Sequence, residues 1–584
     1  MSQGNSGNYK QFKSFDISDD HLSAVNRKRR VALNFDVVLF NPAPNEDPYK
    51  LLEERMVFTD DPSTTIDSIW WNWGEGNIVP YKSKRLPSLQ HDGYQSWLDQ
   101  GIDIVKIFLD ETHKRSLECF YSHRMNGGDM DPRTVPGVGV IFDNFVHEGQ
   151  FSSGIEAGPN KIPMKEENPE WLFDLPWAPS KPWNFAIEEV RQFILGNLTE
   201  IVEDYNFDGI ELDFARGVVF PQGEGWQNRD KLSDFMQQIR QMTLEIEEKR
   251  GRPFLVAARV PENLPGCHFD GLDVETWAKN NFVDIFTVGC RSFEVDIQSF
   301  QKIVRGKSIK IFPSIDDHHS SDGYCTPPIE VFRGLFSNWY QQGADGIQTF
   351  NFAYGPKQAL SPVDPWGDIH LQAYKEIANL PQLLYSDKTF VIQRRGGGHG
   401  QELIAYPEDW ETPRYWYANT NMLAQLPIPL SADDKVDTLL KINIGDDVNT
   451  HYEKVNKVQV KVLLHDCNKE YLKIPRMSLP TKETENQIQR VMIREFVIPF
   501  RPGKENEIAL YNNPVSKDTD KHLQMRINNI LSPIPRINSG WFVFDVPPKH
   551  FALGENLIGL CLTNKKSNQN IMVEKLEIHI SYKK

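Results

Sequence analysis

The stretch Asn206-Phe-Asp-Gly-Ile-Glu-Leu-Asp-Phe-Ala-Arg216 is the part of the chain from which the fold is best deduced. It contains a short apolar run that predicts a strand, with two carboxylates, Glu211 and Asp213, near its end. Side chains alternate along a strand, so both carboxylates point to the same face. Leu212 and Phe214 point to the opposite face, where we expect covering helices. The stretch therefore predicts a buried strand that carries paired acids at its C-terminal tip.

Seven further apolar, β-rich runs alternate with helical patterns between residues 31 and 355. Strands that alternate with helices pair in parallel through right-handed crossovers, and eight of them close a (β/α)8 TIM barrel. We expect helices at residues 102–112, 183–205, 231–249 and 329–342. We expect the strands at residues 31–37, 66–73, 117–126, 208–215, 254–261, 282–291, 309–317 and 344–353.

The pattern changes after residue 385, where helical periodicity disappears and short alternating strands follow. Such strands, separated by turn residues and charges, are typical of an antiparallel β-sandwich. The sequence thus predicts a flexible segment over residues 1–25, a catalytic barrel over 26–380 and a β-sandwich accessory domain over 386–584. Sandwich strands are expected at residues 389–392, 438–444, 455–464, 494–499, 540–546, 556–563 and 572–582.

Composition excludes several classes of protein. The net charge of −16 argues against a nucleic-acid partner, and no apolar run is long enough to cross a bilayer. The basic run at residues 27–30 is interpreted as a solvated edge beside a strand. The six cysteines show no metal-ligand spacing, and the adjacent His318 and His319 point apart, so no metal or other cofactor is expected.

Residues 1–8 are polar and lack the apolar core of a signal peptide. They resemble the flexible tether that follows the lipidated cysteine of a bacterial lipoprotein. This resemblance implies an exported protein, periplasmic or attached to the cell surface. A cytoplasmic protein with an ordinary polar N-terminus is the alternative.

Polar and aromatic side chains at the strand ends should gather at one mouth of the barrel, where the chemistry of such folds is located. Arginine binds carboxylate and sulfate bidentately, so four arginines there predict an anionic sugar as substrate, unless they only neutralise neighbouring acids. Aromatic rings suit the C–H faces of sugars. The expected substrate-binding residues are Arg124, Asn126, Arg216, Arg259, Arg291, Tyr121, Trp71, Trp73 and Asn351.

Three motifs resemble the bacterial glycosyl-hydrolase-like barrels of the family ten glycosyl hydrolase type. They are Phe207–Arg216, Ser122-His-Arg-Met-Asn126 and Asn168-Pro-Glu-Trp-Leu172. The resemblance covers roughly the first 380 residues, and the sandwich resembles the accessory domain that many members carry. It implies a carbohydrate-active enzyme. The family pattern has Asp directly after Arg-Met-Asn, whereas here Gly127-Gly128-Asp129 displaces the acid.

Glycoside hydrolysis is the leading hypothesis for the reaction. It needs two carboxyl groups, about 5 Å apart in retaining enzymes and roughly 6.5–9.5 Å apart in inverting enzymes. Glu211 or Asp213 would act as general acid or base, with Asp316 or Glu262 as the partner. A neighbouring carboxylate would raise the pKa of the acid.

Two other functions stay open. The first is elimination at a uronic acid, as in a dehydratase or lyase acting on ulvan-type oligosaccharides, with His123 or Tyr121 as the base and arginine neutralising the carboxylate. The second is a carbohydrate-binding barrel without catalysis. His123 is also compatible with a buried core histidine, since His123 and Arg124 cannot both point inward from one strand.

Overall fold

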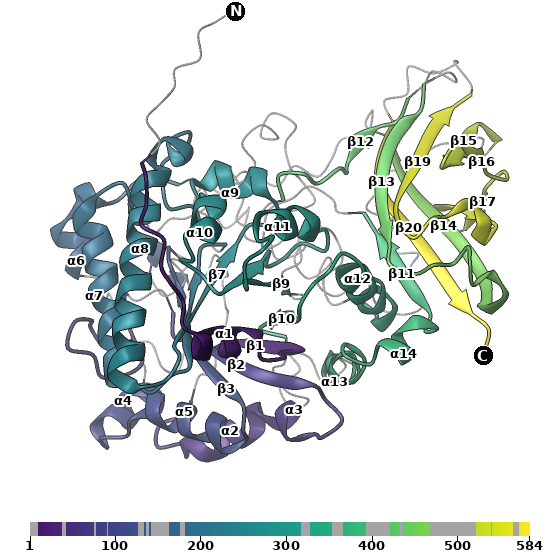
Figure 1. Ribbon diagram of the computed structural model, residues 1–584. Coiled ribbons are helices and arrows are strands. Elements are labelled where there is room, and N and C mark those ends of the chain that lie inside the picture. The colour runs from purple at the N-terminus through teal and green to yellow at the C-terminus, as the bar shows by residue number, and fades with distance from the viewer. Residues whose placement is uncertain are drawn as a thin grey trace, which may run out of the picture.

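The eight strands expected between residues 31 and 353 form a closed parallel barrel, which lies to the left in Figure 1. Around the barrel they run in the order β1-β10-β9-β8-β7-β6-β3-β2, so β1 pairs with both β2 and β10. The barrel strands are β1 Val31–Asp36, β2 Ile66–Asn72, β3 Glu118–Arg124, β6 Gly209–Asp213, β7 Leu255–Val260, β8 Ile285–Val288, β9 Lys310–Ile315 and β10 Ile347–Phe350.

The structure is a computed structural model of the chain. It describes residues 10–37, 42–74, 77–89, 92–126, 133–135, 139–141, 163–175, 181–215, 217–316, 327–352, 366–392, 421–431, 436–466, 521–538, 540–563 and 571–584. A short hairpin of β4, Arg133–Val135, and β5, Gly139–Ile141, belongs to the segment after β3. In the described part of the chain, no helix is both long and apolar enough to cross a membrane.

Helices surround the barrel, and several of them begin at a Ser, Asp or Asn whose side chain accepts a first-turn N–H. The four expected helices are present as α5, α7, α8 and α12, and shorter ones join them. The helices are α1 Asp19–Asn26, α2 Pro48–Arg55, α3 Val57–Asp60, α4 Asp92–Asp99, α5 Ile104–Lys114, α6 Pro163–Glu167, α7 Glu188–Asp204, α8 Gly225–Arg250, α9 Leu264–Asp270, α10 Val274–Lys279, α11 Ile297–Ile303, α12 Ile329–Gln341, α13 Trp366–Glu376 and α14 Leu380–Leu384.

The described residues before the barrel differ from the flexible segment predicted over residues 1–25. The N–H of Phe15 donates to the carbonyl of Asn280, and α1 follows. Val25 of α1 belongs to the apolar cluster inside the N-terminal end of the barrel. His21 is buried, with Nδ1 2.5 Å from Glu247 Oε2 and Nε2 3.0 Å from Asp284 Oδ1. Burial of Val25 and these ion pairs hold α1 against the barrel.

The basic run at residues 27–30 matches the predicted solvated edge only in part, because Arg27 and Lys28 are exposed whereas Arg29 and Arg30 pair with acids. Arg29 is buried and binds both carboxylate oxygens of Glu118, at 2.6 and 2.7 Å. Arg30 binds Asp67 in the same bidentate manner. The run therefore joins the start of β1 to β2 and β3.

Antiparallel strands after residue 387 form two sheets, with the orders β11-β20-β14-β18-β17 and β13-β19-β15-β16, while β12 pairs with β20. One apolar cluster contains residues of both sheets, so the sheets pack as a sandwich. The predicted fold class, a TIM barrel followed by an all-β sandwich, is confirmed; residues 494–499 lie outside the described chain. The strands are β11 Lys388–Val391, β12 Ile428–Pro429, β13 Thr438–Ile444, β14 Val455–Asp466, β15 Leu523–Ile527, β16 Ile530–Leu531, β17 Arg536–Asn538, β18 Trp541–Asp545, β19 Gly554–Leu562 and β20 Ile571–Tyr582.

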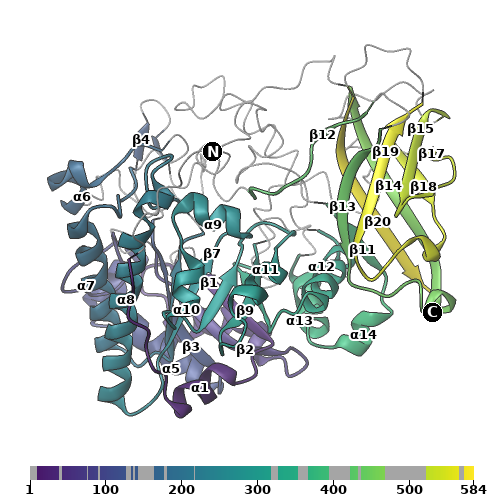
Figure 2. The same ribbon diagram turned by 45° about the horizontal axis from the view of Figure 1, so that its top comes forward.

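Helix α12 lies between the barrel and the sandwich, where it packs against β11, as Figure 2 shows. A Cβ atom at Gly334 would lie 2.3 Å from the carbonyl oxygen of Thr389, so this position of α12 requires glycine. Ser337 Oγ donates to Asp446 at 2.5 Å, and Lys388 Nζ lies 2.7 Å from the same carboxylate. The sandwich is thus fixed to α12 of the barrel by close backbone contact and by the buried hydrogen bond from Ser337 to Asp446.

Candidate active site

The barrel interior is apolar near the N-terminal ends of its strands. Every second residue of each strand points inward, and one layer of these forms a buried apolar cluster with Val25 of α1. Within it, the rings of Trp70 and Phe120 stack with centroids 4.6 Å apart. Leu255 and Phe312 complete the packing from the other side of the barrel. This layer closes the barrel, and the polar groups below it bind one another: Ser68 accepts from Trp70 and donates to Glu118, which pairs with Arg29.

Two residues further along the strands, the interior becomes polar around Glu211. Its carboxylate accepts hydrogen bonds from Asn34 Nδ2 and Ser122 Oγ, both at 2.6 Å, and from Gln348 Nε2 at 2.8 Å. Arg259 adds a guanidinium nitrogen 3.2 Å away. Donors from β1, β3, β7 and β10 therefore surround one fully buried acid.

This arrangement gives Glu211 a positioning role. Carboxylate oxygens that already accept several hydrogen bonds have little capacity left for a substrate. Sequence reasoning missed the donors Asn34, Ser122 and Gln348. Strand alternation could have identified them. Each lies two residues before another inward-pointing residue of the same strand, so it faces the barrel interior too.

Asp213 and Arg259 form the next layer, at the C-terminal ends of β6 and β7. Asp213 Oδ1 accepts the N–H of Ala215, and Oδ2 lies 3.5 Å from Arg259 Nη1. The Arg259 guanidinium stands 4.2 Å from the ring centroid of Phe350, which is a cation–π contact. Burial opposes its charge, but Asp213 and Glu211 together raise the pKa of Arg259 above its ordinary value.

A second ion pair joins β1 and β3 at the same mouth. Arg124 Nη2 donates to Asp36 Oδ2, and the guanidinium also lies over the ring of Phe350. Asn351 donates to Asp36 at 2.6 Å and accepts the Asp36 N–H at 2.9 Å. Asn351 has a φ of 51°, a left-handed conformation that asparagine tolerates. Asn351 therefore orients Asp36 in this structure, whereas the sequence suggested direct substrate binding.

A third ion pair comes from the ends of β8 and β9. Arg291 Nε lies 3.3 Å from Asp316 Oδ2, and both side chains are fully buried. Cys290 Sγ lies 3.5 Å from Arg259 Nη1, which links this pair to Arg259. Burial raises the pKa of the Cys290 thiol to about 11, so the thiol is neutral near pH 7.

Glu262 follows β7 and lies at the same end of the barrel. The side chain is 2% exposed, and its Cγ would be 3.1 Å from a Cβ atom at Gly289. The Glu262 carbonyl accepts the N–H of Asp296 at 2.9 Å, which joins the loops after β7 and β8. Glu262 is therefore a further buried acid at this end of the barrel.

Four residues expected at the mouth instead lie on the outer face of the barrel. Trp71 donates to Thr112 of α5, Trp73 packs on Tyr81, and the Tyr121 hydroxyl lies 3.2 Å from that of Tyr81. Because Phe120, Ser122 and Arg124 point inward, alternation sends Tyr121 and His123 outward. The predicted sugar platform and both proposed elimination bases are therefore wrong.

His123 is a core histidine. It is buried beside the ring of Tyr121, and neither ring nitrogen has a hydrogen-bond partner among the described residues. Burial lowers the pKa of His123 to about 4, so the imidazole is neutral near pH 7. This outcome matches the alternative that the sequence left open.

Asn126 is also structural. Its side-chain amide donates to the carbonyls of Trp183 and Val218, and its oxygen accepts the Trp183 N–H. These bonds tie the end of β3 to the segments that flank α7 and β6, and they occupy the side-chain amide that was predicted to contact a substrate. Arg216, His318 and His319 lie outside the described residues. Within the described ranges, no group of three His, Cys, Asp or Glu side chains is arranged to hold a metal ion.

In the described part of the mouth, three arginines stand among five acidic side chains. Each arginine has a carboxylate partner: Arg124 binds Asp36, Arg259 binds Glu211 and Asp213, and Arg291 binds Asp316. These carboxylates contact the guanidinium groups that would otherwise bind a sulfate or uronate. The arrangement matches the alternative in which the arginines neutralise neighbouring acids.

No family model and no curated protein matches the sequence. Solved structures with similar backbones include the PgaB glycoside hydrolase domain from Bordetella bronchiseptica, at 9% identity and a TM-score of 0.37 over 60% of this chain and 98% of that chain. An α-amylase from Geobacillus thermoleovorans has 9% identity and a TM-score of 0.35, with 92% and 99% covered. A cycloisomaltooligosaccharide glucanotransferase from Paenibacillus sp. has 8% identity and a TM-score of 0.32; 96% of this chain aligns with 58% of that one. At such low scores the likeness says nothing of the reaction, and the family ten resemblance stays a prediction.

Proposed function

We propose that the protein hydrolyses glycosidic bonds at the C-terminal mouth of its barrel. The observation that carries this proposal is the position of Asp213, an inward-facing carboxylate at the tip of β6 whose charge is balanced by Arg259. Barrel enzymes place their reacting groups at this end of the strands. Asp316 lies at the tip of β9, so carboxylates reach the same mouth from two separate strands.

The surroundings of the acids suggest their roles. Arg259 favours the ionised form of Asp213, which suits a nucleophile or general base. Arg291 does the same for Asp316, which would stabilise positive charge on the sugar. Glu262 follows β7 at the same end of the barrel, and its Cγ lies beside Gly289. We assign proton donation to Glu262.

Glu211 acts through Arg259 in this scheme. It binds the Arg259 guanidinium from below, and Arg259 in turn contacts Asp213. A carboxylate fixed by donors from four strands holds that guanidinium in one place. Such fixed charges stabilise a transition state without having to reorganise during the reaction.

The pairing of the arginines bears on which sugar the mouth can accept. The arginines on which an anionic polysaccharide was predicted are paired with carboxylates, which favours a neutral sugar at the mouth. Elimination lacks support, because Tyr121 and His123 lie outside the barrel. Export to the periplasm or cell surface, predicted from the polar residues 1–8, would bring the enzyme to extracellular polysaccharides.

A carbohydrate-binding barrel without catalysis is the second candidate, and one observation favours it. Asp213 and Asp316 are fully buried and Glu262 is 2% exposed, so a sugar can reach them only if this end of the barrel opens. Buried networks of paired acids and arginines also occur where they have a structural role alone. Turnover decides between the two candidates.

The test is a screen of the full chain against neutral and anionic polysaccharides, with reducing ends and ultraviolet absorbance measured in parallel. Hydrolysis releases reducing ends without forming a double bond, whereas elimination forms an unsaturated, absorbing sugar. The Asp213→Asn variant serves as the control for contaminating activity. We expect reducing ends from the wild type alone. Absorbing product would contradict hydrolysis, and binding without either product would favour the second candidate.

A further inference from the structure

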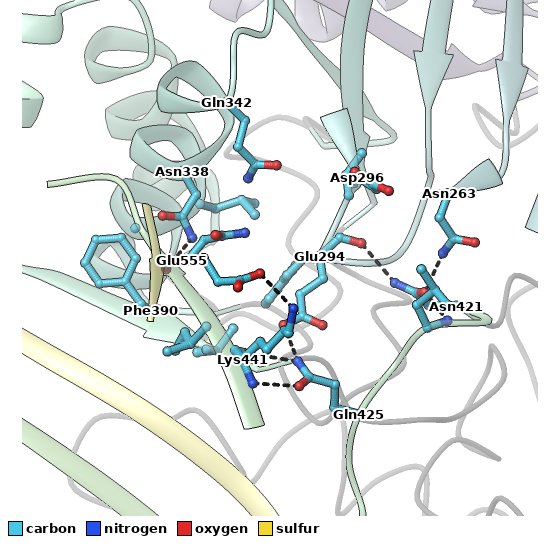
Figure 3. Close-up of a pocket in the computed structure, with 18 of the residues that line it drawn as sticks. Asn263, Glu294, Asp296, Asn338, Gln342, Phe390, Asn421, Gln425, Lys441 and Glu555 are labelled. Carbon is cyan, nitrogen blue, oxygen red and sulfur yellow. Dashed lines mark hydrogen bonds and ion pairs between the residues drawn. The ribbon is translucent and has the colours of Figure 1, made fainter. Parts of the chain in front are cut away.

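A pocket between the barrel and the sandwich lies outside the group of mouth carboxylates (Figure 3). Its volume is about 420 Å³, which lies within the range of small-molecule sites. The loops after β7 and β8 and one face of α12 supply one wall, and β11, β13 and β19 supply the other. Two domains therefore build one pocket.

Side-chain amides from both domains line this pocket, and several are held in fixed orientations. Asn421 accepts from Asn263 Nδ2 at 2.8 Å and donates to the carbonyl of Glu294 at 2.9 Å. Gln425 binds the backbone of Lys441 through both its oxygen and its nitrogen. Amides fixed in this way present donors and acceptors in set directions. Less side-chain entropy is therefore lost when a ligand binds.

Carboxylates add acceptors around the same space. Figure 3 shows Glu294, Asp296 and Glu555 around the pocket, with the amide of Gln342 directed into it. Lys441 Nζ lies 3.2 Å from Glu555, and with Glu294 and Asp296 the lining contains three carboxylates and one ammonium group. The excess of negative charge disfavours sulfate or uronate and leaves neutral hydroxyl groups as suitable partners.

Apolar side chains form the rest of the lining and suit the C–H faces of sugar rings. Leu335 of α12 and Val391 of β11 are buried walls, whereas Leu423 is 52% exposed at the edge. A mixed lining of amides, carboxylates and apolar carbon resembles the balance of hydroxyl and C–H surface on a sugar. The pocket thus matches a neutral carbohydrate in both charge and polarity.

We propose that this pocket binds a neutral oligosaccharide as a subsite beside the mouth of the barrel. Asn263, in its wall, directly follows Glu262, and the N–H of Asp296 donates to the Glu262 carbonyl. A sugar bound there would contact the loop that carries the assigned proton donor and the loop that is hydrogen-bonded to it. The choice of a sugar as ligand rests on the proposed function, whereas the inference that the ligand is uncharged follows from the residues that line the pocket.

Calorimetric titration of the full-length Asp213→Asn variant tests this subsite without turnover. The neutral probes are cellohexaose, xylohexaose and maltohexaose, and the charged probe is hexagalacturonate. We expect at least one neutral probe to bind. The double variant Glu294→Ala and Gln342→Ala, made in the Asp213→Asn chain, should weaken that binding about tenfold or more, because it removes two polar partners.

Glu453→Ala, at an exposed residue of the sandwich outside the pocket, is the matched control and should bind as the parent does. Equal melting temperatures of the variants establish that the fold is intact. Three results would overturn the subsite: no neutral probe binds, the double variant binds as tightly as its parent, or hexagalacturonate binds equally well. Binding at the pocket by a wild type that hydrolyses nothing would refute the proposed reaction and leave the subsite standing.

Discussion

The apolar layer around Trp70 and Phe120, called the lower half below, and the interior above it, called the upper half, are made by the same eight strands but differ in character. In the lower half, Trp70 and Phe120 stack and α1 closes the end. In the upper half, β3 presents Ser122 and Arg124 to buried carboxylates. A step of two or four residues along one strand therefore changes the interior from apolar packing to paired charge.

The difference shows how stability and chemistry are separated within this fold. Apolar burial in the lower half contributes free energy of folding without needing exact partners. Buried charges in the upper half depend on one another, because a charge left without its partner is strongly unfavourable. Changes in the two halves should therefore differ in how they affect stability and turnover.

Arg259→Leu should have the largest effect on stability. It leaves Glu211 and Asp213 buried without their shared guanidinium, which we expect to lower the free energy of unfolding by about 3–5 kcal/mol. Chemical denaturation measures this change. Arg252→Leu, at a partly exposed pair with Asp208, is the matched control and should cost much less. Equal losses in the two variants would mean that the upper half is not an interdependent network.

Leu255→Ala tests the lower half. The side chain is 2% exposed in the apolar cluster, so its loss should reduce the free energy of unfolding by about 2–5 kcal/mol. Turnover per folded molecule should stay unchanged, because the residue is remote from the carboxylates. Leu553→Ala, at a leucine that is 48% exposed, should change stability by only about 0.5 kcal/mol. A fall in turnover at equal folded fraction would contradict the separation of the two halves.

Ser122→Ala and Ser314→Ala together compare the loss of a hydrogen bond to a charged acceptor with the loss of one to a neutral acceptor. Ser122 Oγ donates to the Glu211 carboxylate at 2.6 Å, so its loss should cost about 1–3 kcal/mol. Ser314→Ala removes a donor to the neutral Gln348 amide at 2.8 Å and should cost about 0.5–1.5 kcal/mol. Urea denaturation of both variants shows which of them loses more free energy of unfolding. If Ser314→Ala were the more damaging, Glu211 would not be the centre of the layer.

The smallest effect should be a pH dependence at the lower end, where His21 of α1 lies between two carboxylates. Burial lowers the pKa of His21, but Asp284 and Glu247 outweigh it and raise the pKa above 6.5. The protonated form therefore stabilises the fold fully below pH 6.5, and this contribution is lost as pH rises through the raised value. His21→Gln should flatten stability against pH between 6 and 9. An unchanged slope would show that α1 docks without this charge.

The strands and the acid pair could be predicted from sequence because both depend on local alternation. Glu211 and Asp213 both face the barrel interior, as their spacing of two residues requires. Alternation alone does not say which set of residues faces inward, and this is why Trp71, Trp73, Tyr121 and His123 were assigned to the wrong side. Their register is fixed by packing against α5 and neighbouring helices.

Pairings between distant residues could not be read from the sequence. Arg124 meets Asp36 across the β1 and β3 ends, and Arg29 meets Glu118 below them. Each arginine on its own suggested an exposed or substrate-binding cation. Only the closure of the barrel brings these charges together, and it also brings Asn34 and Gln348 to Glu211.

Asp213 and Asp208 stand at opposite ends of β6, and comparing them tests the central claim most directly. Asp213→Asn should lower turnover about 10²–10⁴-fold at an unchanged folded fraction, because it removes a reacting carboxylate. Asp208→Asn should lower stability, since it alters contacts to His113 and the Cys119 N–H, while turnover per folded molecule remains that of the wild type. The measurement is the initial rate of reducing-end release by both variants on one polysaccharide. If Asp213→Asn retains the wild-type rate, the mouth carboxylates do not perform the hydrolysis.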